Sequence, residues 1–314
     1  MHATPVSARP GRDCPLSYRY GPSALAAPAT LRAETLWVAG GLYGNGAALA
    51  ALLADYQAEA GDKALVLNGD FHWFDADPEE FDRINRAVLA HCAMRGNVET
   101  ELADPVEGAG CGCGYPDWVG DTEVERSNRI IDRLRGAARA APGALASLRA
   151  LPMHRVAEVG GARVAIVHGD ADSLAGWGFS QEALATPDGA RRAREALAAA
   201  RAAVYACSHT CLPVLQAFEG AGAVINNGAA GMPNFSGTRF GLATRISVRA
   251  RPGALYSARV GALHLEARPV AYDHAAWAAR FLELWPEGSA AHASYWARIA
   301  DGPRYALPRA RRAA

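Results

Sequence analysis

Short, uninterrupted apolar runs alternate along this chain with longer segments of helical periodicity. The run Ala64 to Leu67 follows a Gly-Asp turn and ends at Gly69-Asp70, a pattern typical of a strand buried on both faces. Residues 35–39 form a similar run, followed by a glycine-rich turn and an amphipathic helical segment at 47–60. Strand, turn, helix and strand make a βαβ unit, so parallel strands with a right-handed crossover are expected.

The rest of the pattern predicts further helices and strands. Helices are expected at 78–90, at 123–150 with a break at Pro142-Gly143, and at 181–201, 275–284 and 291–300. Strands are expected at 90–94 and 202–206, as hairpins over 153–168 and 214–226, and as edge strands at 242–248 and 262–270. Because βαβ units come first and antiparallel hairpins later, the economical interpretation is an α/β fold of two mixed sheets flanked by helices.

The chain divides into three parts by composition. Residues 1–33 are rich in Pro, Ala, Arg and Ser and predict an irregular N-terminal arm. Residues 34–272 hold the main domain, and residues 273–314 hold C-terminal helices and a basic, solvated tail. Within the main domain, residues 103–121 form a Gly/Cys-rich loop that is long for a connector, which suggests a lid.

Composition excludes several classes of function. Lys plus Arg and Asp plus Glu both number 32 in 314 residues, so bulk charge indicates no nucleic-acid partner. No apolar run approaches the roughly 18 residues of a membrane span, and the N-terminus lacks a signal-peptide pattern. We therefore expect a cytoplasmic protein without a membrane partner. In that setting the six cysteines are not a disulfide framework, and Cys111 and Cys113 are interpreted as inert thiols of the loop.

Four side chains able to bind a metal follow predicted strands. Asp70, Asn97, His168 and His209 each come at or shortly after a strand end. A single Asp in such a place is more often a turn residue, but four donors at the ends of four strands favour a shared site. Oxygen and imidazole donors suit a divalent ion such as Mn, Fe, Zn or Mg.

The order of these residues resembles the calcineurin-like metallophosphoesterases. The elements are Gly69-Asp70, Gly96-Asn97-x-Glu99, His168-Gly169 and His209-Thr210, and the resemblance covers about residues 36–231. It implies a four-layer αββα sandwich that hydrolyses phosphate mono- or diesters, here with a small-molecule phosphate ester as substrate. It also implies that Asp70, Asn97, His168 and His209 bind one metal ion, and that Glu99 orients a ligand.

The sequence departs from the family pattern at the second metal. The family's first motif, Asp-x-His-Gly-Asn, aligns with residues 41–45, where both metal ligands are missing. The second histidine of Gly-His-Thr-His is Cys211, and the histidine after Gly-Asn is Val98. The resemblance therefore implies one complete metal subsite and an atypical or missing second one.

Three interpretations follow from these departures. In the preferred one, a single-metal enzyme uses Arg95 or His72 to stabilise charge in the transition state. In the second, Tyr43 and Cys211, with Asp70, rebuild the missing subsite, because they stand where ligands are lost. In the third, the chain is a catalytically inactive phosphate- or nucleotide-binding module.

The aspartate after His168-Gly169 also has two interpretations. Asp170 either orients an imidazole or caps the turn that follows it.

Overall fold

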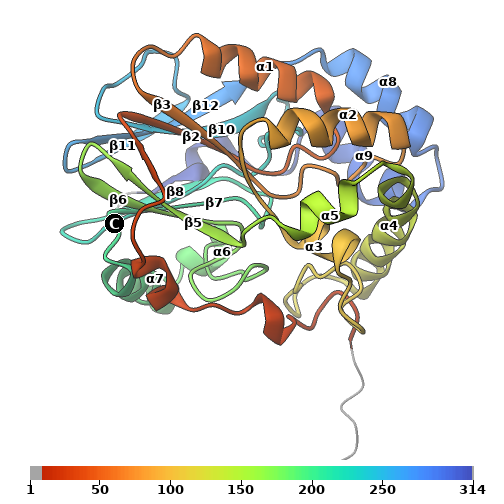
Figure 1. Ribbon diagram of the computed structural model, residues 1–314, viewed down its shortest axis with the longest axis horizontal. Coiled ribbons are helices and arrows are strands. Elements are labelled where there is room, and N and C mark those ends of the chain that lie inside the picture. Colours follow the sequence, from red (N-terminus) through yellow and green to blue (C-terminus); the bar gives the residue numbers. More distant parts are fainter. Residues whose placement is uncertain (1–8, 313–314) are drawn as a thin grey trace, which may run out of the picture.

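Two mixed β-sheets lie face to face with helices on both outer sides in the computed structural model, which describes residues 9–312 (Figure 1). In spatial order, the six-stranded sheet contains β11 (Tyr256–Val260), β12 (Leu263–Val270), β10 (Gly241–Ser247), β2 (Thr35–Ala39), β3 (Lys63–Asn68) and β4 (Cys92–Met94). The seven-stranded sheet contains β1 (Leu31–Ala33), β5 (His154–Val159), β6 (Ala162–Val167), β7 (Val204–Cys207), β9 (Gly222–Asn226), β8 (Val214–Phe218) and β13 (Arg311–Arg312). The predicted α/β fold of two mixed sheets flanked by helices is confirmed.

The first half of the six-stranded sheet follows the predicted βαβ pattern. β2, β3 and β4 are parallel, joined by helices α1 (Gly46–Gln57) and α2 (Pro78–Leu89). The Asn45 side chain caps α1, and the Asp77 side chain caps α2 by accepting hydrogen bonds from two backbone N–H groups. These caps set where each strand stops and each helix begins, so the loops at the strand ends have fixed lengths.

An apolar layer fills the space between the sheets. Its side chains include Leu36 and Val66 from the six-stranded sheet and Val164, Ile166 and Ile225 from the seven-stranded sheet. Helices α1, α2, α8 (His274–Leu284) and α9 (Ala290–Asp301) contribute to a second core on the outer side of the six-stranded sheet. Helices α6 (Gln181–Leu184) and α7 (Pro187–Ala200) cover the other sheet. Helices α3 (Asn97–Ala103), α4 (Asp121–Ala140) and α5 (Ala144–Arg149) pack together at one end of the sandwich (Figure 1).

Two sequence predictions about individual elements are wrong. The segment 181–201 is two helices because Pro187 opens the second one and Thr186 caps it; a residue before proline disfavours helical backbone. Strands β10 and β12 are interior strands, since the missed strand β11 pairs beyond β12 and forms that edge.

Both ends of the described chain join the seven-stranded sheet. Within the predicted irregular arm, short 3₁₀ helices occur at Leu16–Tyr18 and Pro22–Ala26, and β1 pairs in parallel with β5. Near the C-terminus a 3₁₀ helix at Leu307–Ala310 leads into β13, which pairs with β8. The expectation of a solvated tail is therefore wrong up to residue 312, and residues 1–8 and 313–314 lie outside the described residues.

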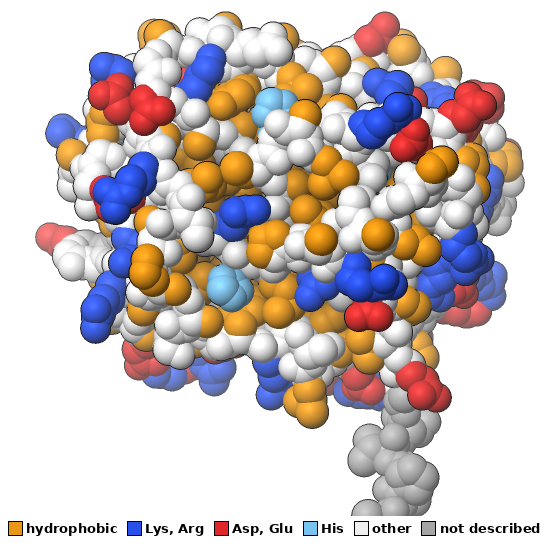
Figure 2. Space-filling model, viewed as in Figure 1, with side chains coloured by type: hydrophobic (Ala, Val, Ile, Leu, Met, Phe, Trp, Pro, Cys, Tyr) orange, Lys and Arg blue, Asp and Glu red, His pale blue; other side chains and the backbone are white. Residues whose placement is uncertain are grey.

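The surface carries charges of both signs. On the face in Figure 2, Lys and Arg side chains are interspersed with Asp and Glu side chains. Across residues 9–312, every helix is too short or too polar to span a lipid bilayer.

Candidate metal centre and its pocket

The four predicted metal ligands converge at one end of the sandwich. Asp70 follows β3, Asn97 is the first residue of α3 just after β4, and His168 and His209 follow β6 and β7. One ligand atom from each of Asp70, His168 and His209 lies within 4.8 Å of the others. The carboxyl ends of parallel strands in both sheets thus deliver donors from distant parts of the sequence to one place.

Backbone carbonyls fix the protonation of the two imidazoles. His168 Nδ1 lies 2.8 Å from the Asn68 carbonyl oxygen, and His209 Nε2 lies 2.9 Å from the Cys113 carbonyl oxygen. Since a carbonyl oxygen only accepts hydrogen bonds, both of these nitrogens carry a proton. In neutral rings the remaining nitrogens, His168 Nε2 and His209 Nδ1, each carry a lone pair, and the two atoms lie 3.2 Å apart.

Two oxygen atoms complete this set of acceptors. The Asn97 side chain donates through Nδ2 to the Cys111 carbonyl oxygen at 3.0 Å, which turns its Oδ1 toward His168 Nε2 at 3.3 Å. Asp70 Oδ1 also lies 3.3 Å from His168 Nε2. Four acceptor atoms face one another, and such an arrangement is repulsive unless a positive charge lies among them. The residues therefore fit a divalent cation, with both histidines and the asparagine held by carbonyl groups outside the ligand set.

The ionisation of these groups agrees with a cation-binding role. Burial and the neighbouring His168 lower the pKa of His209 to about 4, so its ring is neutral at neutral pH. Burial acts to raise the pKa of Asp70, but the two histidines outweigh it and the pKa is lowered. Burial also acts to lower the pKa of His168, but Asp70 outweighs it and the pKa is raised. A metal ion would therefore compete with a proton at His168.

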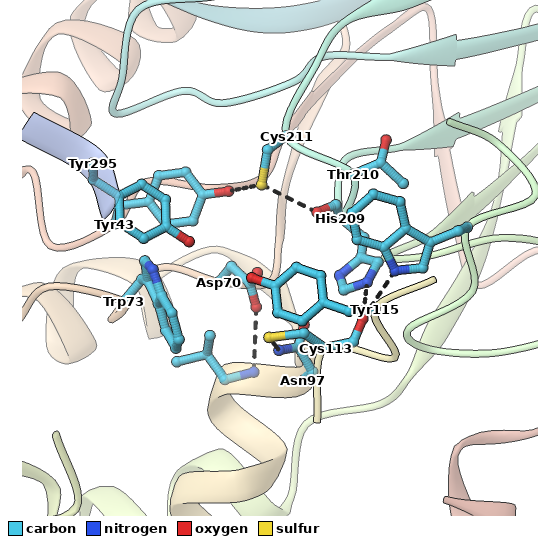
Figure 3. A pocket seen from close by; sticks show the side chains of 12 residues that line it. Tyr43, Asp70, Trp73, Asn97, Cys113, Tyr115, His209, Thr210, Cys211 and Tyr295 are labelled. Carbon is cyan, nitrogen blue, oxygen red and sulfur yellow. Dashed lines mark hydrogen bonds between the residues drawn. The ribbon is translucent and has the colours of Figure 1, made fainter. Parts of the chain in front are cut away.

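Three of the four predicted ligands, all but the fully buried His168, lie in the wall of a small pocket with a volume of about 160 Å³ (Figure 3). In Figure 3, Asp70, Asn97 and His209 face the same space, while Tyr43 and Cys211 meet at another side of it. The lining residues are Tyr43, Asp70, Trp73, Asn97, Val98, Cys113, Tyr115, Trp177, His209, Thr210, Cys211 and Tyr295.

Two solved structures share this architecture. A metallophosphoesterase from Sphaerobacter thermophilus matches with a TM-score of 0.56 and 16% sequence identity, covering 86% of this chain and 100% of that chain. The chain has the calcineurin-like metallophosphoesterase fold. A hypothetical protein from Pyrococcus horikoshii OT3 matches with a TM-score of 0.58 and 16% identity, covering 86% of this chain and 99% of that chain. No protein-family model matches the sequence, and no curated protein matches it either.

Within this metallophosphoesterase fold, the side chains of Tyr43 and Cys211 are hydrogen-bonded to each other. Tyr43 Oη lies 2.8 Å from Cys211 Sγ, and the Cys211 thiol donates to the His209 carbonyl oxygen at 3.2 Å. Burial is the main cause that raises the pKa of both groups, so both stay protonated at neutral pH without a metal ion. Among the described residues, the cluster of carboxylate, imidazole and thiol groups that could hold a metal does not include Cys211.

Backbone strain is concentrated at this pocket. Tyr43, Asp70 and Cys211 have positive φ angles of 54°, 53° and 62°, and Arg201 is the fourth such non-glycine residue in the described chain. Glu99 holds the strained Asp70 in place, because its carboxylate accepts hydrogen bonds from the backbone N–H groups of Asp70 at 2.8 Å and Phe71 at 3.0 Å. Strained backbone of this kind often marks functional sites. Glu99 thus lies where the resemblance implied a supporting role.

The structure places three other predicted residues outside the pocket lining. His72 is buried, stacks on Phe81 at 3.6 Å between ring centroids, and lies 2.9 Å from the Asp75 carboxylate. Arg95 is half-buried, and its Nε has no hydrogen-bond partner among the described residues. Asp170 accepts hydrogen bonds from backbone N–H groups of the loop after it, so it shapes that turn, while Asn68 orients the His168 ring.

The Gly/Cys-rich loop supports the cluster from behind. Its Cys111 and Cys113 carbonyls hold Asn97 and His209, and Cys113 also forms part of the pocket wall. Gly112 between them has a φ of 65°, and a side chain there would collide with Tyr18 of the N-terminal arm. The loop is therefore a supporting wall for the ligands, where the sequence suggested a lid.

The N-terminal arm in turn holds this loop. Arg12 donates to the Pro116 and Val119 carbonyl oxygens, and Tyr18 donates to Glu101 at 2.6 Å. No sequence pattern indicates this role for the arm, because the contacts join segments about 100 residues apart.

Several pocket residues also escaped the sequence prediction. Trp73 and Tyr115 stand beside the recognisable motifs, but Trp177 and Tyr295 come from a turn and from helix α9, without a motif to mark them. Their proximity follows only from the three-dimensional packing.

Proposed function

We propose that this chain is a phosphoesterase that hydrolyses a small-molecule phosphate ester with one divalent ion bound by Asp70, Asn97, His168 and His209. The observation that carries the proposal is the convergence of four acceptor atoms whose orientations are set by groups outside the ligand set. The metallophosphoesterase fold adds support, because this set stands at the strand ends where ligands bind in α/β sheets.

A divalent ion in this site would polarise a phosphate oxygen and lower the pKa of a bound water. The protein's own contribution is to hold the ligands rigidly before the ion arrives. The Asn68, Cys111 and Cys113 carbonyls fix three ligand side chains, and the Val98 backbone N–H donates to Asp70 Oδ1 at 3.3 Å. The aromatic walls of the pocket would exclude bulk water from a bound ester and so strengthen electrostatic interactions within it.

One ion fits the site better than two. The Tyr43 hydroxyl and the Cys211 thiol are protonated and bound to each other, so filling a second subsite would require breaking that contact and removing protons from both. The cost is smaller at the first subsite, where His209 is already neutral and the ion displaces a proton at His168 alone. The oxygen and imidazole donors suit Mn, Fe, Zn or Mg.

Turnover of generic aryl phosphate mono- and diesters under added manganese tests the proposal. We expect hydrolysis by the wild type, none by His209→Ala, and retained hydrolysis by Cys211→Ser, which changes the neighbouring pocket wall but not the ligand set. Equal activity in wild type and His209→Ala would contradict the site assignment. Metal and phosphate binding without turnover would instead indicate the catalytically inactive binding module.

A further inference from the structure

Aromatic side chains from five separate segments surround the space beside the metal ligands. These side chains are Tyr43, Trp73, Tyr115, Trp177 and Tyr295. Trp73 and Tyr295 meet edge to face at 6.4 Å between ring centroids, and Tyr115 and Trp177 lie 5.8 Å apart. These rings supply five of the twelve residues that line the pocket of about 160 Å³.

The polar atoms of these rings are mostly occupied within the protein. The Tyr115 hydroxyl lies 3.0 Å from the Ser127 hydroxyl, and Trp177 donates through Nε1 to the Cys113 carbonyl oxygen at 3.0 Å. The Tyr43 hydroxyl is held by its contact with the cysteine thiol described above. The walls therefore offer mainly ring carbon to a ligand, and this favours an apolar, flat partner.

The charge of the pocket limits the ionic state of the ligand. Of the described residues that line the pocket, none is Lys or Arg, and Asp70 is the acidic one. A divalent ion and the Asp70 carboxylate together carry one net positive charge, which matches the single negative charge of a phosphodiester. A phosphomonoester carries about −1.5 to −2 at neutral pH and would bring unpaired negative charge into the pocket.

The same charges argue against a cationic ligand. Aromatic boxes also bind substituted ammonium groups, but here the ligand would lie beside a site with net positive charge. Arg298, which is not among the lining residues, donates to the Cys211 carbonyl oxygen at 2.6 Å and brings no negative charge that would favour a cation. A neutral ring meets no such repulsion.

The volume of the pocket indicates the size of that ring. A cavity of roughly 150 Å³ accommodates benzene, so about 160 Å³ matches one six-membered ring more closely than a fused pair. Outside the pocket lining, Trp118 is 63% exposed and lies edge to face against the lining residue Trp177 at 6.3 Å. Trp118 thus extends the aromatic surface outward from the pocket.

We propose that the preferred substrate is a monoanionic phosphodiester in which one ester group is a single aromatic ring bound between these side chains. This inference rests on the proposed phosphoesterase function and narrows its substrate class. Tyr295 and Trp118 are assigned as specificity-determining residues, because Tyr295 lines the pocket, Trp118 packs on the lining residue Trp177, and neither is a metal ligand or supports one.

Quenching of tryptophan fluorescence by ligands that resist hydrolysis tests the inference on magnesium-loaded protein. The phenyl monoester of methylphosphonate is compared with the methyl and 1-naphthyl monoesters, and with phenylphosphonate as a dianion at pH 8.5. We expect the phenyl monoester to bind about 10- to 100-fold more tightly than the methyl monoester. It should also bind more tightly than the naphthyl monoester and the dianion.

Variants separate the ring contacts from the rest of the site. Trp118→Ala and Tyr295→Leu should each reduce the preference for phenyl over methyl about threefold or more. Leu282→Ala, an exposed apolar residue of α8 outside the pocket, should leave the preference unchanged. Because Trp118 is exposed, its truncation does not threaten folding.

The outcomes distinguish this inference from the proposed function. Equal affinity for phenyl and methyl monoesters, with aryl ester hydrolysis intact, would overturn the aromatic preference alone. Tighter binding of the dianion would overturn the charge argument. A clear phenyl preference in a protein that hydrolyses no ester would support the ring pocket and overturn the phosphoesterase.

Discussion

Replacing Gly112 by alanine should weaken metal binding even though Gly112 is no ligand. The residue lies between the two cysteines whose carbonyls orient Asn97 and His209, and its φ of 65° disfavours any side chain. An added Cβ would collide with the Tyr18 hydroxyl and lie 2.9 Å from Glu101 Cγ. Since these neighbours are buried, the loop has to move, and the two carbonyls move with it.

The size of the effect follows from these contacts. Left-handed backbone costs a residue with a side chain about 1–2 kcal/mol. Loss of the Tyr18 hydrogen bond to the Glu101 carboxylate would cost about 1.5–3 kcal/mol more. We therefore expect Gly112→Ala to lower the free energy of unfolding by about 2.5–5 kcal/mol. Misplaced supporting groups typically reduce metal affinity about 10- to 100-fold, and we expect a loss in that range.

Calorimetric titration of metal-free protein with Zn²⁺, paired with urea unfolding, measures both effects. Gly136→Ala is the matched control, because Gly136 lies in helix α4 with no atom within 4 Å of an added Cβ. The control should keep its metal affinity and gain about 0.5–1 kcal/mol of stability. Unchanged zinc affinity in a folded Gly112→Ala protein would refute the supporting role of the loop.

Three further predictions concern ionisation and the arm. Burial raises the pKa of Asp75 to about 6 from 3.8, so its stabilising contribution is present below pH 3.8 and is lost as the pH rises through about 6. Asp75→Asn should therefore gain up to about 3 kcal/mol relative to wild type between pH 4 and 7 in urea unfolding; a constant difference would contradict the burial argument. Metal affinity should fall as the pH drops, because a proton competes at His168, whose pKa Asp70 raises; pH-independent zinc affinity from pH 8 to 5.5 would contradict this. Tyr18→Phe removes the hydroxyl that donates to Glu101 and should cost about 1.5–3 kcal/mol in thermal unfolding, so an unchanged melting temperature would mean that the arm does not support the loop.

Local patterns account for what the sequence predicted well. The buried apolar run before Gly69-Asp70 and the caps of α1 and α2 are local sequence patterns. The βαβ unit at the start of the main domain could therefore be predicted from the sequence. The strand ends converged as expected because parallel strands place their carboxyl ends together. By contrast, the apolar pattern does not determine the pairing of β11 with β12. It also does not show that the helical segment 181–201 is divided into two helices at Pro187.

The sequence predicted only those residues of the candidate site that belong to recognisable motifs. Asp70 and His209 were identifiable because each belongs to a recognisable element, whereas Trp177 and Tyr295 reach the pocket by packing alone. The support of the ligands by Cys113 runs through a backbone carbonyl, which carries no side-chain signature in a sequence. His72 seemed close to Asp70 by numbering, yet its ring packs on Phe81 away from the pocket lining.

The number of metal ions that each chain retains decides whether the four ligands form a one-ion site. Protein purified without chelator, and protein stripped and reloaded with manganese or zinc, would be assayed by elemental analysis together with His209→Ala. We expect close to one ion per chain in the wild type and none in the variant. Two ions per chain would mean that Tyr43 and Cys211 rebuild a second subsite, and no retained ion after reloading would contradict the metal centre itself.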